Sequence, residues 1–519
     1  MPVFQRILKS MGLTSDPSQQ AASNPEPDPP IPASLFQAIS RLRASFGHSA
    51  DLVIREWEDA AAPSRRVAVA YIEGIVDPKL LSKLVEAITE QLPSVSGGPA
   101  AMETRIQGKL PVGKVKLVHT EGHLRADLLT GNAVILTDGF PAALAASVPG
   151  GEKRGVEEPT SQTVIRGPKE GFTEDLTVNV SLLRRKLRTS DLRIERRTIG
   201  RYTQTPVVMA YIEGLADTAV LDEMRKRLDA IDTDSVLESG YIEELIQDKT
   251  WTPFPTMMNT ERPDSTAGSL LEGQVALLVD GTPFVLLAPV TFFKFFQSSE
   301  DYYQRYDLSS FLRVIRLFAF FVAMLLPSLY IAVSTFHQEM MPSTLLVSLA
   351  AQREGTPLPA LIEALLMEIT FEVIREAGVR MPRAIGPAIS IVGALVLGQA
   401  AVQAGLVSGA MVIVVSFTAI ANFVIPAFNM AASVRLIRFG LMFLAGTLGL
   451  FGILAGAVPI LTHVVNVRSF GVPYFTPLAP IWMNNWKDLV VRVPWPLMKT
   501  RPAVIGKQNR QRQGPKTNS

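Results

Sequence analysis

Cysteine is absent from the 519 residues of the chain. Its absence excludes a disulfide scaffold, a zinc site with thiolate ligands, a thiol nucleophile and lipidation of cysteine. An excess of charge of one sign is also lacking, because 50 Lys and Arg residues oppose 48 Asp and Glu residues. A net charge near zero argues against a protein that binds nucleic acid mainly by neutralising phosphates. We therefore expect no nucleic-acid partner.

Charged residues are missing from three long stretches of the C-terminal half, namely 317–338, 384–434 and 439–467. A helix that crosses a bilayer needs about 20 mostly apolar residues. The second stretch is too long for one helix, and Gly405 and Gly409 mark a break in its middle. Core helices of a soluble protein rarely run this far without charge. We expect a membrane domain over residues 310–467 with four crossings, near 317–338, 385–402, 410–430 and 439–464.

Small residues recur in the last of these crossings. Gly452 and Gly456 lie one helical turn apart, a spacing that lets two helices approach closely. We expect helix packing at this pair. Glycine is also tolerated in lipid without any packing role, and this alternative stays open.

The stretch between the first and second crossings, residues 342–383, is too charged for an ordinary crossing and too apolar for a free loop. Helical periodicity over residues 358–377 places Glu368, Glu372 and Glu376 on one stripe. The sequence therefore predicts a helix with an acidic face in this stretch.

A further carboxylate, Glu363, falls among apolar residues on the other side of this helix. A carboxylate there is unfavourable unless it is paired, protonated or facing water. One interpretation is a helix lining an aqueous path that favours cations, with candidate residues Glu363, Glu368, Glu372 and Glu376. The other is an interfacial amphipathic or re-entrant helix whose acidic stripe is only solvated. The position of Glu363 slightly favours the first.

The orientation follows from the basic residues. The tail over residues 468–519 is rich in Lys and Arg, with Asp488 as its acidic residue, and such segments tend to stay in the cytoplasm. The N-terminus lacks the apolar core and cleavage site of a signal peptide, so we expect the N-terminal part in the cytoplasm too. Two ends on one side require an even number of crossings, which four satisfies. Arg435 and Arg438 would then lie in an outward-facing turn.

Three sequence blocks of the N-terminal half occur twice in the same order, as 51–56 with 191–196, 68–88 with 208–231, and 131–141 with 273–283. We infer two copies of one α/β subdomain, over residues 34–150 and 151–300, the second with a connector over residues 151–190. A leader over residues 1–33, rich in Pro and Ser, is expected to be disordered.

Each copy has the same local pattern. An apolar run is followed by Glu-Gly and by an Asp that can cap a helix, at Asp77 and Asp217. A later apolar run ends in Asp-Gly, at Asp138 and Asp280, a strong signal for a tight turn between strands. The sequence therefore predicts a tandem-repeat α/β soluble N-terminal domain, followed by an all-α polytopic membrane domain and a basic cytoplasmic tail.

Signatures of catalysis are lacking, since neither a Walker A sequence nor a nucleophile elbow occurs. His119 and His123 have the spacing of one helix face, but Gly122 weakens a helix there and no further ligand motif follows. Glu73 and Glu213 recur in both copies at strand ends, where turn geometry explains them. We expect no enzyme, no cofactor and no metal site.

Two further segments have a biased composition. Residues 181–201 are dense in Arg, which is typical of an RNA-binding arm, a patch for anionic lipid or a solvated connector, and we favour the connector. Residues 289–316 gather Phe and Tyr just before the first crossing. Aromatic rings suit the headgroup zone of a membrane, so we expect them there.

Several segments resemble the A subunits of GerA-family spore germinant receptors. They include FHQEMMPSTLLVSLAAQREG, PALIEALLMEITFEVIREAGVRMP, IVGALVLGQAAVQAGLVS and RSFGVPYFTPLAP, in that order. The resemblance extends over about residues 171–480. The family commonly has an acidic residue at the position of Gln399, which is neutral here and is the remaining candidate residue of the ion path.

The resemblance implies a location in the inner membrane of a bacterial endospore. It also implies two partners, a B-type transporter-like subunit that senses nutrients and a C-type lipoprotein subunit. The A subunits would associate into a ring that conducts monovalent cations. Alternatives are a paralogue linked to dipicolinate release and a secondary transporter, although four crossings without an internal repeat are few for a transporter. A membrane-anchored enzyme is disfavoured by the motif search.

Overall fold

The computed structural model describes residues 28–59, 62–91, 114–150, 159, 162–381, 396–482, 486–502, 505–506 and 508–513. Most of the expected leader, residues 1–27, and most of the expected crossing near 385–402 lie outside the described residues. The end of the leader differs from the prediction, because Ile31 is buried in the core of the first subdomain. Its amide donates a hydrogen bond to the carbonyl of His119.

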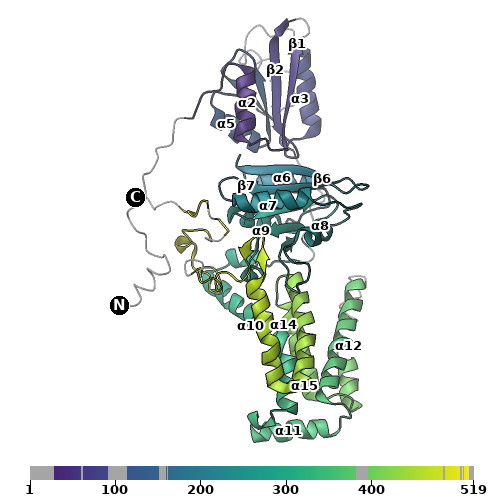
Figure 1. Ribbon diagram of the computed structural model, residues 1–519. Helices are drawn as coiled ribbons and strands as arrows, with labels where there is room; N and C mark the ends of the chain where they lie inside the picture. Colours follow the sequence, from purple (N-terminus) through teal and green to yellow (C-terminus); the bar gives the residue numbers. More distant parts are fainter. Residues whose placement is uncertain are drawn as a thin grey trace, which may run out of the picture.

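The first subdomain is a five-stranded antiparallel sheet with helices on both faces (Figure 1). Its elements are α2 (Leu35–Ser45), β1 (Leu52–Asp59), β2 (Ala62–Ile72), α3 (Pro78–Gln91), β3 (Val115–Val118), α5 (Glu121–Leu129), β4 (Asn132–Thr137) and β5 (Ala143–Ser147). Successive residues of β2 alternate between the two faces. Ala68 and Ala70 pack with α2 and α5, whereas Val67 and Val69 pack with α3.

The second subdomain repeats this plan. Its elements are α6 (Leu176–Lys186), β6 (Leu192–Ile199), β7 (Thr205–Ile212), α7 (Thr218–Asp229), α8 (Ser239–Ile246), β8 (Met258–Thr260), α9 (Pro263–Leu271), β9 (Val275–Val279) and β10 (Val285–Ala288). The sheet orders β1-β2-β4-β5-β3 and β6-β7-β9-β10-β8 correspond strand for strand. The predicted tandem α/β architecture is confirmed. Residues 151–190, which we expected to be a connector, differ from the prediction because α6 lies within them. α6 is the first helix of the second copy, as α2 is of the first.

The repeated Asp-Gly pairs do more than turn the chain. They join β4 to β5 and β9 to β10, and Gly139 and Gly281 have φ of 83° and 87°, a region that glycine adopts without strain. In addition, Asp138 Oδ1 accepts a hydrogen bond from the amide of Leu35 at 2.9 Å. Asp280 Oδ1 accepts one from the amide of Leu176 at 3.2 Å. Each turn thus binds the first helix of its own copy.

The two subdomains are joined by a buried ion pair. Arg184 of α6 donates from Nε to Asp51 Oδ2 at 2.6 Å and from Nη2 to Asp51 Oδ1 at 2.9 Å. Beside it, the amide of Ala50 donates to the carbonyl of Ile194 on the edge strand β6. The arginine-rich segment is therefore not a solvated connector, because it forms α6 and β6 and its Arg184 is 1% exposed.

The C-terminal domain is helical (Figure 1). It contains α10 (Tyr306–Thr335), α11 (Ser343–Glu354), α12 (Ala360–Arg380), α14 (Gly409–Phe423) and α15 (Phe428–Asn466). Residues 396–403 are also helical. Among the described residues, α10 and α15 are long and apolar enough to cross a membrane. The helix expected near 410–430 ends earlier, because Pro426 follows α14 and a proline disfavours helix in the residue before it.

The last expected crossing, near 439–464, is not one straight helix. Gly449 is non-helical, with φ 61° and ψ −140°, and divides α15 into two arms. The arms fold back on each other, since a Cβ at Gly456 would lie 2.8 Å from the side chains of Leu441 and Leu444. At the same turn, a Cβ at Gly449 would lie 2.7 Å from His337, just past the end of α10. The chain therefore enters the helical domain through α10 and leaves it through α15, both on the side that faces the second sheet.

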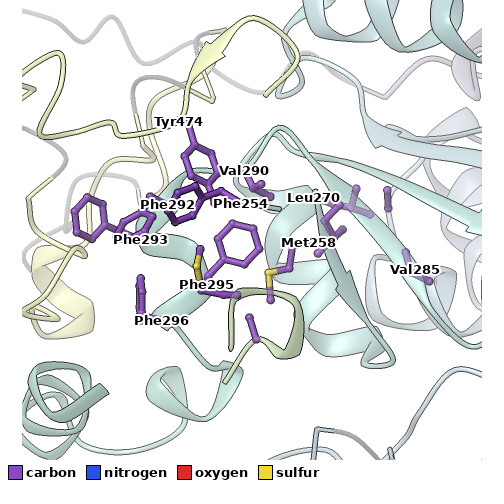
Figure 2. Packing of buried hydrophobic residues seen from close by; sticks show 14 of the residues in the cluster. Phe254, Met258, Leu270, Val285, Val290, Phe292, Phe293, Phe295, Phe296 and Tyr474 are labelled. Carbon is purple, nitrogen blue, oxygen red and sulfur yellow. The ribbon is translucent and has the colours of Figure 1, made fainter. Parts of the chain in front are cut away.

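The phenylalanines just before α10 are buried inside the protein, whereas Tyr306 and Phe311 of α10 are 46% and 62% exposed. The position of the segment at the headgroups stays a prediction. Four of its phenylalanines form the short helix η2 (Phe292–Phe296), and each is at most 6% exposed. Figure 2 shows them grouped with Phe254 and Tyr474. The Phe292 ring centroid lies 5.6 Å from that of Phe320 on α10 and 6.1 Å from that of Tyr474 in the tail. One aromatic core thus holds together the second sheet, α10 and the tail.

A second buried arginine stabilises this junction. Arg313 of α10 donates to Asp301 Oδ2 at 2.9 Å and to Asp488 Oδ1 at 2.6 Å. Asp301 lies in the short helix η3 (Ser299–Tyr302), and Asp488 lies in the tail. Side chains of Arg313 and Asp301 are 2% and 1% exposed. The start of α10 is therefore tied both to the soluble domain and to the tail.

We predict that Arg184→Met loosens the contact between the two subdomains. Removing one partner leaves Asp51 buried without its cation, which lowers the free energy of unfolding by about 3–5 kcal/mol. Hydrogen exchange at the Ala50 amide should become faster than in the unaltered protein. Arg201→Gln is the control, because the Arg201–Asp232 pair is about two-thirds exposed. Its loss should change the free energy of unfolding by about 1 kcal/mol or less. Equal exchange at Ala50 in both variants would contradict this role of Arg184.

Candidate functional site on α12

Charged side chains meet inside the helical domain, between α12 and the first arm of α15. Glu368 Oε2 lies 2.9 Å from Arg438 Nη2, and both side chains are 1% exposed. One turn further along α12, Glu372 lies 3.0 Å from Arg435, 2.7 Å from Arg375 and 3.5 Å from Arg438. Two carboxylates thus share three guanidinium groups, and the side chains of Glu372 and Arg375 are 23% and 19% exposed. We refer to these five residues as the charge cluster.

Hydrogen bonding within the charge cluster is incomplete. Buried atoms without a hydrogen-bond partner include Glu368 Oε1 and the Nε atoms of Arg435 and Arg438. Buried polar atoms are usually satisfied, and an unpaired charge in a low dielectric is costly. The charges of the cluster are therefore paired, but the desolvation of these atoms is not compensated by hydrogen bonds.

The helical spacings explain how the cluster forms. Glu368 and Glu372 are four residues apart on α12, and Arg435 and Arg438 are three apart on α15, so each pair lies on one helix face. The prediction that these arginines lie in an outward-facing turn is wrong, because they lie within the first arm of α15. The matching spacings were a sequence signal for this contact, but they did not show which helices were neighbours.

Glu363 lies in the first turn of α12, before Glu368, and has a different environment. Its side chain is 0% exposed. Its Oε1 atom accepts hydrogen bonds from the amide and the hydroxyl of Ser408, both at 2.6 Å. Ser408 is the N-cap of α14 and its hydroxyl accepts a hydrogen bond from the amide of Met411. The positive end of the α14 dipole therefore faces the carboxylate, while Glu363 Oε2 has no partner.

The remaining candidates lie elsewhere. Glu376 is 57% exposed and pairs with Arg380 at the end of α12. Gln399 is exposed on the helical segment 396–403. Gly452 and Gly456 lie on the second arm of α15, where it packs against the first arm. The structure thus brings Glu363, Glu368 and Glu372 onto the buried side of α12 and leaves the other two polar candidates outside.

The outer side of α12 is apolar. Leu366, Ile369 and Val373 are 44%, 53% and 62% exposed. Glu363 and Glu368 are covered by α14 and α15, so in this conformation they line no open passage. An aqueous path along these carboxylates requires α12 to move relative to α14 and α15.

The described residues contain no group of three His, Asp or Glu side chains suited to a metal ion. His119 lies outside α5, and the Nδ1 atom of His123 lies 2.8 Å from the hydroxyl of Thr120. The two histidines therefore do not share one helix face.

Comparisons with known proteins agree on one family. The sequence profile described as Bacillus/Clostridium GerA spore germination protein matches residues 40–504. The chain is 47% identical to spore germination protein KA of Bacillus subtilis (strain 168) over 484 residues, which cover 93% of this chain and 89% of that protein. It is 39% identical to spore germination protein GerLA of Bacillus cereus over 475 residues, which cover 92% and 96% of the two chains.

A solved structure is also similar. The crystal structure of the N-terminal domain of the A subunit of the Bacillus megaterium spore germinant receptor GerK3 is 36% identical to the matched part of this chain. The match covers 51% of this chain and 99% of that domain, with a TM-score of 0.41.

We predict that Arg438→Met destabilises the helical domain, because Glu368 then stays buried with no cation in contact. The expected loss is about 3–5 kcal/mol of unfolding free energy, measured by denaturation of the purified protein in detergent. The double variant with Glu368→Gln should regain much of this loss, because both charges are then gone. As a control, Arg380→Gln removes a pair whose side chains are 78% and 57% exposed and should change stability by about 1 kcal/mol or less. A double variant no more stable than Arg438→Met would show that the two residues are not coupled.

Proposed function

This chain belongs to the GerA family of spore germination proteins, and we propose that it is the membrane subunit of a spore germinant receptor that forms an oligomeric cation channel. The channel would open when partner subunits sense a nutrient. The partners we propose are a B-type transporter-like subunit and a C-type lipoprotein subunit, and the location is the inner membrane of the endospore. The family assignment supports a role in spore germination, and the charges on α12 support the ion path.

The main support for the proposed ion path is Glu363, a carboxylate inside the helical domain. Ionisable groups inside membrane helices are rare and tend to mark ion or proton pathways. Glu363, Glu368 and Glu372 provide carboxylates at successive turns of one helix, and one oxygen of Glu363 has no partner. Such oxygens can replace part of the water around a cation. We infer that the observed packing corresponds to a closed state.

Opening would exchange the partners of these carboxylates. A rotation or tilt of α12 would separate Glu363 from Ser408 and Glu368 from Arg438, and would turn their oxygens toward water. The exposed apolar side of α12, around Ile369 and Val373, would face lipid or a neighbouring copy of the chain. Self-association into a ring would place several copies of α12 around one axis, so that a wide path forms between chains.

We infer six crossings for the helical domain in place of the four expected. These would be α10, α12, the predicted crossing near 385–402, α14 and the two arms of α15. Six is an even number, so the soluble domain and the tail stay on one side, as the shared junction of α10 and α15 with the second sheet supports. The basic tail favours the cytoplasmic side.

We predict that Glu363→Gln changes cation flux without lowering the amount of protein. Glutamine keeps an oxygen that accepts from Ser408 but removes the charge, so the barrier for a cation should shift by about 1–2 kcal/mol, or about tenfold in flux. The measurement is ion flux from the purified chain in liposomes, and ion release from spores that carry the variant with its partner subunits.

The matched control is Glu354→Gln, which neutralises an exposed carboxylate at the end of α11. It should leave flux unchanged. Equal flux in Glu363→Gln and the unaltered protein would remove Glu363 from the path. A folded oligomer that conducts no ions in liposomes would mean that this chain does not form the pore by itself.

A further inference from the structure

A cavity of about 420 Å³ lies where the second subdomain, the segment before α10 and the C-terminal tail meet. The volume is within the range of small-molecule sites, roughly 300–1,000 Å³. Its walls include Ser269 of α9, Lys294 of η2, Tyr302 of η3, and Trp495 and Arg501 of the tail. The cavity lies at the soluble junction and is separate from the carboxylates of α12.

Two residues of the cavity wall each have a buried polar atom without a hydrogen-bond partner. Ser269 is 1% exposed, and its hydroxyl is unpartnered. The side chain of Asp264 is 6% exposed, and its Oδ2 is bound by Arg262 and by the hydroxyl of Tyr303, while its Oδ1 is unpartnered. Such atoms are rare in folded proteins. A ligand that donates one hydrogen bond and accepts another would satisfy both.

The cavity also has an excess of positive charge. Glu272 accepts from Lys294 at 2.9 Å and from Arg512 at 3.3 Å. Although burial alone would raise the pKa of Glu272, these two cations hold it below its usual value, so the carboxylate is ionised. The negative charge of Glu272 thus offsets one of the two positive charges of Lys294 and Arg512.

Arg501 adds a further positive charge to the wall of the cavity. Among the described residues it has no acidic partner, and it donates instead to the carbonyl of Leu271 at 2.8 Å and to groups of the tail such as Asn509. Burial and the neighbouring charge of Arg512 lower the pKa of Arg501. An anion placed beside Arg501 would relieve this repulsion.

Flat side chains form another part of the wall. Trp495 and Tyr302 have ring centroids 6.0 Å apart, and the guanidinium of Arg512 lies 5.9 Å from the Trp495 ring centroid. A flat ring can pack against such surfaces, in offset or edge-to-face geometry. A ligand with a negative charge, a flat ring and a hydrogen-bond donor would therefore match the charge, the aromatic walls and the unpartnered atoms of the cavity.

We propose that this cavity binds a small aromatic carboxylic acid that also carries an N–H or O–H donor. The carboxylate would contact Arg501, the ring would pack along Trp495, and the polar groups would bond to Ser269 and Asp264. The site does not depend on the channel proposal, because none of its residues lies in α12. A bound ligand would connect the tail to the start of α10, since Tyr302 also donates to Asp488, a partner of Arg313.

The test uses the full chain in detergent with two matched probes, indole-3-acetate and its neutral amide, indole-3-acetamide. Binding is measured by ligand-detected NMR and by calorimetric titration. We expect the acid to bind at least about tenfold more tightly than the amide, because a charged hydrogen bond is at stake. Arg501→Gln should weaken binding of the acid by about the same factor and remove the preference over the amide.

Ser269→Ala provides a variant that should fold well, because it removes a buried hydroxyl that has no partner. It should weaken binding of the acid severalfold. Arg510→Gln is the control, since it neutralises an exposed arginine of the same tail, and it should bind as the unaltered chain does. The proposal is overturned if neither probe binds at millimolar concentration. It is equally overturned if acid and amide bind alike, or if Arg501→Gln and Ser269→Ala both bind the acid normally.

Discussion

Each junction of this chain depends on an arginine buried against a carboxylate. Arg184 with Asp51 joins the two subdomains, Arg313 with Asp301 joins the soluble part to α10, and Arg438 with Glu368 joins α12 to α15. A guanidinium stays charged at any ordinary pH, so its burial is tolerated only while the acid is in contact. The relative positions of the parts are therefore specified by charge, in addition to apolar packing.

This constraint bears directly on how the helical domain could act. Apolar contacts weaken gradually as helices slide, whereas a buried pair that separates must find new partners. α12 is fixed at two levels, by the Glu363–Ser408 hydrogen bonds and by the charge cluster. A helix held in this way favours discrete positions over a continuum, as the proposed gate would require. The tail is tied to the start of α10 through the ion pair of Asp488 with Arg313.

Much of the architecture could be predicted from local pattern. The repeated blocks predicted two copies of one α/β unit, because the positions of strand, turn and cap recur with the fold. The charge-free stretches predicted the helical domain, and the position of Glu363 predicted an unusual carboxylate. The number of crossings stays a prediction, but the turn inside the last uncharged stretch and the partners of two arginines were not predicted. A run of uncharged residues does not show where a glycine reverses the chain, and Arg435 and Arg438 read as surface charges until their partners on α12 are known.

The sequence by itself determined most of the elements, namely the repeated strands, the long apolar helices and the aspartates that cap a helix or form a turn, since these depend on neighbours within a few residues. Tertiary structure alone decided the pairings. Asp51 and Arg184 are 133 residues apart, Glu363 and Ser408 are 45 apart, and the cavity joins α9 to a tail more than two hundred residues away. Such contacts arise from packing of whole elements, and local periodicity contains no information about which faces will meet.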